Sequence, residues 1–313
     1  MLTYTNIFSK WINYAAINNS NFVAITPAMR EGSGLVEFEE KFPSRFFDVG
    51  IAEQHSVTLA AGIALGGLKA IVAIYSTFLQ RAFDQLVHDV NLQNLDVMFA
   101  IDRAGLVGAD GETHHGIYDI SFMRILPNII LMTPSNEREL LLMLNTGLSH
   151  KGPSAIRYPR GNTGCHDIVM TEEKVSIGKS KLIQKGQKLA ILVFGQLLSE
   201  VIDISIKLSL TLVDMRFAKP IDKERLDELS NTHQHIITIE DNVVTGGAGS
   251  SINEYLVEKG YEITVTNFGI PDQIISHGSQ NELYAEIGLD KKSLEYRINE
   301  IYDHISNNKK IVK

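Results

Sequence analysis

The chain has 313 residues, of which 44% are hydrophobic and 21% are charged, a composition typical of a folded protein long enough for two domains. Its formal net charge of −8 argues against nucleic acid as a partner, because a phosphate backbone needs a basic surface. The single cysteine, Cys165, excludes an intrachain disulfide framework, and no apolar run approaches the ~20 residues of a membrane span. The first residues lack a signal-peptide pattern, so we expect a cytoplasmic protein with no membrane partner.

The first half of the chain alternates short β-rich runs with helical patterns, which predicts a parallel sheet with helices on both faces. We expect strands at residues 22–26, 45–49, 70–75, 97–102, 129–133 and 155–158, and helices at 52–65, 78–92 and 136–148. Ser135 or Asn136 is the expected N-cap of the third helix.

The periodicity weakens after Arg160, and residues 171–187 are the predicted linker. A second alternation follows, with strands expected at 189–194, 211–215, 236–240 and 263–267 and helices at 197–208, 223–229, 250–259 and 291–306. The predicted fold class is therefore α/β, with two domains at 1–170 and 188–313. Each domain is expected to be a mostly parallel sheet with helices on both faces.

A first candidate functional residue, Glu53, lies between an apolar run ending at Asp48 and an apolar-periodic helix, just after Gly50. This places it at a strand-to-helix turn, where open α/β sheets usually keep their ligands. A second candidate, Arg81, follows the next predicted strand, and Thr77 is the expected N-cap of its helix. An exposed arginine on an amphipathic helix is the alternative interpretation of Arg81.

Residues 102–116 form a long loop after the fourth predicted strand, with four glycines and the side chains of Asp110, Glu112, His114 and His115. Such loops are more often functional than structural. A metal site is conceivable, but the possible ligands are crowded into one loop, so we favour glycines that let a ligand approach the backbone.

Two further clusters follow. Arg160, after the sixth predicted strand, is a second guanidinium that can join Arg81 around a phosphate, although an arginine closing the domain is an equal alternative. Residues 240–250 combine an acid, glycines and a helix start; we interpret them as a tight turn that lets helix and sheet approach, because they lack the spacing of a dinucleotide or P-loop motif.

In this order, the clusters resemble the 1-deoxy-D-xylulose-5-phosphate synthases, thiamine-diphosphate enzymes of the transketolase superfamily. The matching strings are residues 25–34, 47–55, 74–85, 102–111, 113–116 and 158–161. The resemblance extends from near residue 4 to past residue 290 and is looser in the last domain. It implies a transketolase-like pyrimidine-binding domain followed by a transketolase C-terminal-like domain.

The synthases have a further, N-terminal domain, which holds the cofactor's diphosphate through Mg²⁺ with a Gly-Asp-Gly motif and a later Asn. This chain has no such motif. The resemblance therefore implies the C-terminal portion of a synthase: a fragment, a proteolytic remnant or one subunit of a split enzyme. Alone it is expected to be inactive, with the missing domain or a complementary subunit as a partner and a homodimer as its assembly.

The resemblance also implies roles for particular residues. Glu53 hydrogen-bonds the aminopyrimidine ring of thiamine diphosphate, and Ile51 and Phe78 lie against the cofactor. His114 is catalytic and lies with Asp110 near the reacting carbonyls of the substrates, pyruvate and D-glyceraldehyde 3-phosphate. The substrate-binding residues implied are Tyr75, Arg81, Arg103, Asp110 and Arg160.

Two other interpretations remain open. The beta subunit of a thiamine-dependent 2-oxoacid dehydrogenase shares this two-domain architecture and a comparable glutamate, and is naturally a separate chain. Against it, the strings at 75–81 and 102–116 look like the synthase, and a dehydrogenase has no need of two phosphate-facing arginines. The other interpretation is a non-catalytic assembly module, which dimerises but binds no cofactor by itself.

Overall fold

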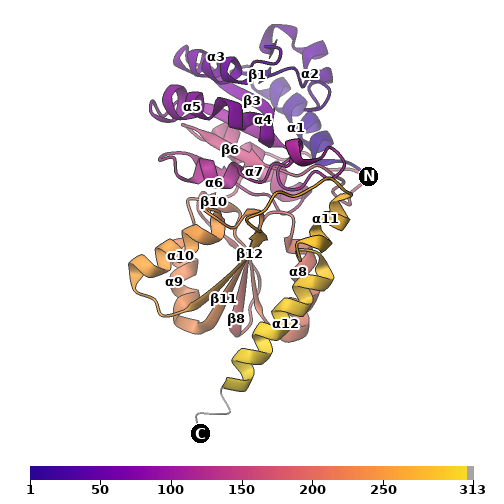
Figure 1. Ribbon diagram of the computed structural model, residues 1–313. Coiled ribbons are helices and arrows are strands. Elements are labelled where there is room, and N and C mark those ends of the chain that lie inside the picture. The colour runs from indigo at the N-terminus through magenta and orange to yellow at the C-terminus, as the bar shows by residue number, and fades with distance from the viewer. Residues whose placement is uncertain (309–313) are drawn as a thin grey trace.

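The computed structural model describes residues 1–308 and contains two α/β sheets, each in its own half of an elongated molecule (Figure 1). The first sheet has the strand order β10-β5-β6-β4-β3-β1-β2. Its strands are β1 Phe22–Thr26, β2 Phe46–Asp48, β3 Lys69–Tyr75, β4 Val97–Asp102, β5 Ile130–Met132, β6 Ser154–Arg157 and β10 Phe217–Lys219. All neighbours are parallel except β10, which pairs antiparallel with β5.

Helices cover both faces of this sheet. They are α1 Tyr4–Asn18, α2 Val36–Lys41, α3 Glu53–Leu65, α4 Ser76–Leu79, α5 Phe83–Gln85, α6 Asp119–Arg124 and α7 Glu137–Ser149. Successive side chains of a strand point to opposite faces: Ile71 packs with Trp11 of α1 and the leucines of α7, while Val72 packs with Val57 of α3. The alternation of the strands thus feeds two separate apolar layers.

The second sheet has the order β12-β11-β8-β9-β7 and is parallel except for β7. Its strands are β7 Lys181–Gln184, β8 Lys188–Phe194, β9 Thr211–Asp214, β11 His233–Val243 and β12 Thr264–Ile270. Its helices are α8 Leu198–Leu208, α9 Lys223–Thr232, α10 Ala248–Lys259, α11 Gln280–Glu286 and α12 Lys291–Asn308. Figure 1 shows α9 and α10 on one face and α8 and α12 on the other.

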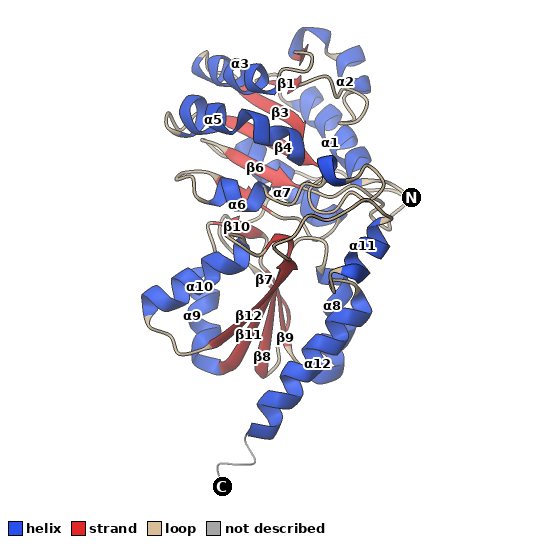
Figure 2. Cartoon of the chain, in the orientation of Figure 1, coloured by secondary structure: helices blue, strands red, loops and turns tan. Residues whose placement is uncertain are grey.

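The predicted fold class is confirmed: both sheets are mostly parallel and covered by helices on both faces. The domain boundaries stay a prediction, but two details differ from it. The range 171–187, predicted as a linker, contains β7, which pairs with β9. Moreover, β10 leaves the second half of the chain to extend the first sheet, at the junction of the two units (Figure 2).

Two local predictions are also confirmed. Asn136 is the N-cap of α7, and its side chain accepts a hydrogen bond from the backbone N–H of Glu139. At residues 240–250, the carboxylate of Glu240 accepts from the backbone N–H groups of Ala248 and Gly249. A Cβ atom placed on Gly249 would overlap the hydroxyl of Thr238, so this turn does bring the helix close to the sheet.

Candidate active site

The predicted site residues follow the carboxyl ends of neighbouring parallel strands in the first sheet. Tyr75 ends β3 and is in register with Asp102, which ends β4. On the other side of β4 lies β6, which leads into Arg160. Because the carboxyl ends of parallel strands share one edge of a sheet, these side chains gather there.

Glu53 is the first residue of α3, and its side chain is only 5% exposed. Its Oε2 atom lies 3.4 Å from Nη1 of Arg81, whose side chain is 60% exposed. The N-terminal end of a helix stabilises a nearby negative charge. The structure thus shields a carboxylate at the sheet edge, with a solvent-exposed guanidinium as its neighbour.

Three rings lie side by side next to this edge. The rings of Tyr75 and Phe78 are stacked, with centroids 5.2 Å apart and planes 12° from parallel. The imidazole of His114 meets Phe78 edge-on at 5.6 Å. Burial raises the pKa of Tyr75, and its hydroxyl can donate a hydrogen bond. The rings form an aromatic wall with polar groups at its ends.

Arg103 lies over the Tyr75 ring, with its guanidinium carbon 4.2 Å from the ring centroid. Its Nη1 atom is 2.9 Å from Oδ2 of Asp102 and donates to the backbone oxygen of Gly32 at 3.1 Å. Asp102 is fully buried and also accepts from the hydroxyl of Thr5 at 2.7 Å, a residue of α1. Burial raises the pKa of Asp102, and the adjacent Arg103 opposes that shift. The pair fixes Arg103 against the aromatic wall.

Arg160 forms an ion pair with Asp110, at 2.6 Å between Nη1 and Oδ2. Arg81 and Arg160, which the sequence grouped around one phosphate, therefore each face a different carboxylate. Their joint role in phosphate binding stays a hypothesis.

One capping prediction is wrong. Thr77 does not cap a helix: α4 begins at Ser76 with no side-chain cap, and the Thr77 hydroxyl donates to the backbone oxygen of Thr113 at 2.9 Å. The hydroxyl of Thr77 therefore bonds to the 102–116 loop and not to the backbone of its own helix. The helix predicted at 78–92 is also interrupted; it consists of α4, a 3₁₀ turn Gln80–Ala82, α5 and a π-helical segment Leu86–Asn91.

The remaining candidates differ in exposure. Ile51 lies on the turn before α3 and is 80% exposed. His115, which received no role from the sequence, is buried; its Nδ1 accepts from the backbone N–H of Val107, and its Nε2 lies 3.1 Å from the backbone oxygen of Ser276. His115 is thus a structural residue of the loop, whereas Ile51 presents an apolar surface to solvent.

The sequence missed the groups that support the site from outside its own strands. Thr5 is far from Asp102 in sequence, and the pattern around it carries no sign of their contact. Asp102 was noted only as the start of the loop, although an acid ending an otherwise apolar buried strand is a signal that such a residue has a cationic partner.

Neither a cluster of metal-ligand side chains nor a membrane-spanning helix is found in the part of the chain that the structure describes. Residues 1–308 hold no group of three or more His, Cys, Asp or Glu side chains that could bind a metal ion. Over the same residues, no helix has the length and apolar character needed to cross a bilayer.

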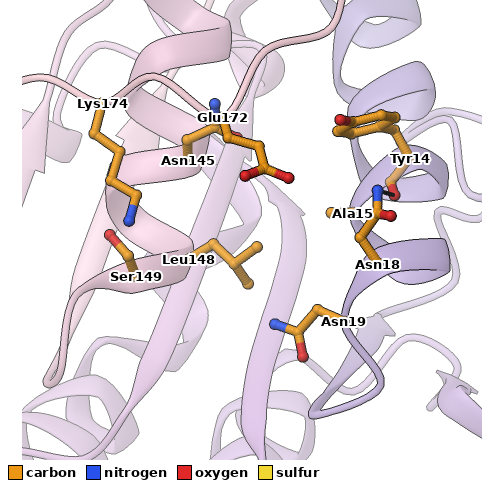
Figure 3. A pocket seen from close by; sticks show the side chains of 9 residues that line it. All are labelled: Tyr14, Ala15, Asn18, Asn19, Asn145, Leu148, Ser149, Glu172 and Lys174. Atoms are coloured by element: carbon orange, nitrogen blue, oxygen red, sulfur yellow. Dashed lines mark hydrogen bonds between the residues drawn. The ribbon is translucent and has the colours of Figure 1, made fainter.

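Two cavities lie away from the aromatic wall. One has a volume of about 280 Å³ and is lined by the end of α1, by α7 and by the segment after β6. Figure 3 shows its lining side chains, among them Asn19, Leu148 and Lys174. A second, of about 540 Å³, opens between the two domains and is lined by polar side chains such as Asn136, Gln196 and Gln280. No predicted site residue lines either of them.

Two family models match the chain. Residues 1–165 match the family described as Transketolase, pyrimidine binding domain, and residues 178–294 match Transketolase, C-terminal domain. The chain belongs to the transketolase family. The resemblance found in the sequence is confirmed by curated relatives described as 1-deoxy-D-xylulose-5-phosphate synthase. The one from Idiomarina loihiensis is 52% identical over 95% of this chain, and the one from Haemophilus influenzae strain Rd is 54% identical over 95%.

The transketolase-family chain spans about half the length of the curated relatives it matches, 48% of the Idiomarina loihiensis protein and 47% of the Haemophilus influenzae protein. Among solved structures, a split-gene transketolase in an inactive beta4 tetramer aligns with a TM-score of 0.84 at 24% identity, over 96% of this chain and 98% of that one. Transketolase from Campylobacter jejuni aligns with a TM-score of 0.77 at 15% identity, over 96% of this chain and 46% of that one. These structures share the fold.

Proposed function

We propose that this chain is the C-terminal portion of a thiamine-diphosphate-dependent 1-deoxy-D-xylulose-5-phosphate synthase. The enzyme joins pyruvate to D-glyceraldehyde 3-phosphate with loss of CO₂, giving 1-deoxy-D-xylulose 5-phosphate, a precursor of isoprenoids, thiamine and pyridoxal. The observation that carries the proposal is identity of 52% over 95% of the chain to a synthase, together with a shielded carboxylate at Glu53 and an aromatic wall at the same edge of the sheet.

The residues present fit the pyrimidine ring of thiamine diphosphate. The ring needs a carboxyl group that is protected from water and an apolar surface to lie against. Glu53 is buried, and Phe78 is stacked on Tyr75 with the ring of His114 edge-on against it. When bound, thiamine diphosphate supplies the electron sink for decarboxylation. In the loaded enzyme Glu53 would hold a proton at the pyrimidine nitrogen, Phe78 and Ile51 would orient the ring, and His114 would exchange a proton with the reacting carbonyl.

The basic side chains at the wall suit a phosphorylated aldehyde. Guanidinium groups bind phosphate through paired, charge-assisted hydrogen bonds. The guanidinium of Arg103 lies over the ring of Tyr75. Arg160 forms an ion pair with Asp110 of the 102–116 loop. Phosphate binding by Arg160 would compete with its ion pair to Asp110. Arg81, beside Glu53, is the remaining cation of the proposed site.

The rest of the site belongs to a domain outside this chain. The diphosphate and its Mg²⁺ need an additional group of oxygen ligands, which we assign to the N-terminal domain of the complete enzyme or to a complementary subunit. The exposed side chain of Ile51 lies on the turn that this partner would cover. We propose that the isolated chain is inactive, that the assembled enzyme is a homodimer and that it is cytoplasmic.

A chimera tests the proposal. In it, this chain replaces the matching half of the Haemophilus influenzae relative, and turnover of pyruvate with D-glyceraldehyde 3-phosphate is followed by product formation. We expect activity in the chimera, none in the chain alone, and none in the chimera without thiamine diphosphate. A chimera that binds thiamine diphosphate and Mg²⁺ by calorimetry yet consumes neither substrate would contradict the proposal.

A non-catalytic or complementary subunit of a split enzyme is the second candidate, favoured by one observation: the chain covers 98% of a split-gene transketolase chain described as an inactive tetramer. Calorimetry of the chain alone with thiamine diphosphate and Mg²⁺ tests it. Absence of binding, together with binding after addition of the missing half, supports this form of the enzyme; tight, metal-dependent binding by the chain alone contradicts it.

A further inference from the structure

None of the predicted site residues comes from the C-terminal domain. This domain nevertheless contacts the 102–116 loop at two points, Leu106 and His115, on either side of Asp110 and His114. At Leu106, both backbone groups are engaged: the N–H donates to Oδ1 of Asp241 at 3.4 Å, and the oxygen accepts from Nε2 of Gln280 at 2.6 Å. Asp241 lies in β11 and Gln280 begins α11, so one loop residue is gripped by two separate elements.

The second attachment follows the central part of the loop. The ring of His115 connects Val107 to the backbone oxygen of Ser276, at 3.3 Å and 3.1 Å. One residue beyond the loop, the backbone oxygen of Ile117 accepts from the N–H of Val243 at 2.9 Å. Asp110 and His114, the predicted substrate-facing residues, therefore lie between two points that are fixed to the C-terminal domain.

The packing between the loop and the C-terminal domain leaves no room for a side chain at two glycines of the loop, Gly105 and Gly108. Gly105 has a φ angle of +78°, and a Cβ atom placed on it would overlap the carboxylate of Asp241. Gly108 also has a φ angle of +78°, and its Cβ would lie 3.0 Å from the backbone nitrogen of Gln280. Both conformations favour glycine, and both glycines face the same two residues that hold Leu106.

Asp241 is itself held rigidly. It is 2% exposed, and its Oδ2 accepts from the hydroxyl of Tyr284 at 2.7 Å and from Nε2 of Gln196 at 2.9 Å. Its backbone oxygen accepts from Nη2 of Arg157, at the end of β6, at 2.9 Å. A buried acid with this many partners is a fixed reference point, because moving it would leave several buried polar groups unpaired.

We propose that the C-terminal domain braces the site, with Asp241 and Gln280 as positioning residues that fix the 102–116 loop and hence the places of Asp110 and His114. The proposal rests on the proposed function for what the loop acts on, but its structural part stands on the contacts alone. It explains why a domain with no residue at the aromatic wall shares an interface with the loop. Loosening the brace should disorder the loop while leaving Glu53 and Phe78 in place.

Hydrogen exchange followed by mass spectrometry tests the brace in the 313-residue chain, without cofactor. Gln280→Ala removes the hydrogen bond to Leu106 and should speed exchange in peptides covering 103–116 by roughly ten-fold, the effect expected when one hydrogen bond that holds a local structure is lost. Asn281→Ala, at the exposed neighbouring position, is the matched control and should leave exchange unchanged. Peptides of β4, which precede the loop, should not change in either variant.

Asp241→Asn is the second variant, since an amide oxygen can still accept from Leu106 while the charge is lost; it should give a smaller increase than Asp241→Ala. The proposal is overturned if loop exchange in Gln280→Ala and Asp241→Ala equals that of the parent chain, or if it rises equally in β4, which would indicate general destabilisation. Because this experiment needs neither cofactor nor turnover, an inactive chimera would count against the proposed function and not against the brace.

The chimera adds a readout that a merely structural role would not move. Gln280→Ala there should raise KM for D-glyceraldehyde 3-phosphate several-fold, because the loop carries Asp110 with its partner Arg160, and leave the affinity for thiamine diphosphate unchanged. If the loop of the variant exchanges faster than that of the parent while KM is unchanged, the order of the loop has no part in substrate binding. That result would overturn the functional half of the proposal.

Discussion

Glu53 and Glu240 occupy similar places in the two domains, yet they have different partners. Each is a buried acid close to the first turn of a helix that follows a strand and a glycine. Glu240 gives both carboxylate oxygens to the N–H groups that begin α10, whereas α3 begins without a side-chain cap and Glu53 faces the guanidinium of Arg81. Burial of an acid is therefore no sign of function; what matters is whether the backbone already uses its hydrogen-bonding capacity.

Glu53→Gln in the chimera should have the largest effect. Loss of a positioned proton donor or acceptor typically lowers turnover by about 10²–10⁴-fold. The change keeps the size of the side chain, so the melting temperature of the isolated chain should stay close to that of the parent. Steady-state turnover and thermal unfolding measure the two quantities. Near-normal turnover would remove Glu53 from the mechanism and would make it, like Glu240, a structural acid.

Glu240 should show its role in stability and not in turnover. Burial raises its pKa from the ordinary 4.5 to about 7, so between these values the folded chain binds more protons than the unfolded chain. The contribution of Glu240 to stability should therefore fall by about 3 kcal/mol as the pH rises from about 4.5 to 7, and remain lower above that range. Urea unfolding across this pH range measures the slope.

Glu240→Gln should flatten this pH dependence, because the variant side chain does not titrate. Glu40→Gln makes the same change of charge at an exposed position and is the control. Asp214, whose pKa burial raises to about 6, contributes in the same direction, so part of the slope should persist in the Glu240 variant. A variant that retains the whole slope would show that the carboxyl group of Glu240 is not the titrating group.

Arg81→Ala should have the next largest effect. It distinguishes a role of Arg81 in binding the substrate phosphate from a role beside Glu53. If it binds the substrate phosphate, the chimera should lose one charge-assisted hydrogen bond, and KM for D-glyceraldehyde 3-phosphate should rise roughly ten- to a hundred-fold, with a much smaller change for pyruvate. Arg138→Ala, on the exposed surface of α7, is the control for loss of charge. Equal effects on both substrates, or weaker binding of thiamine diphosphate, would assign Arg81 to Glu53 instead of the phosphate.

The contrast between the two acids also shows what sequence patterns can predict. Except for β10, which no pattern indicated, the strands of the first sheet were predicted to within one residue at each end, because apolar runs between helical patterns depend on local sequence. The turn at Glu53 was recognised from the sequence. The pattern at residues 240–250 could not reveal that both carboxylate oxygens of Glu240 accept hydrogen bonds from the first N–H groups of α10. That fact depends on a distance between residues eight and nine positions apart in a folded turn.

Contacts between distant segments were beyond sequence reasoning altogether. The N-terminal helix α1 supplies Thr5 to Asp102 across 97 positions, and β10 joins a sheet whose other strands end before residue 160. Gln280 reaches Leu106 across 174 positions. Each depends on how the two halves of the chain pack together, for which local periodicity carries no information.

The smallest effect compares a glycine in each of the two helices. Gly249 in α10 touches the sheet, so Gly249→Ala should destabilise the chain by about 1–3 kcal/mol through overlap with Thr238. Gly62 lies within α3, and a Cβ atom there meets nothing within 4 Å, so Gly62→Ala should stabilise the chain by about 0.5–1 kcal/mol through helix propensity. Urea unfolding of both variants measures the difference. Opposite signs mean that α10 lies directly on its sheet at Gly249 while α3 leaves free space at Gly62; equal signs would mean that the two helices are packed alike at these positions.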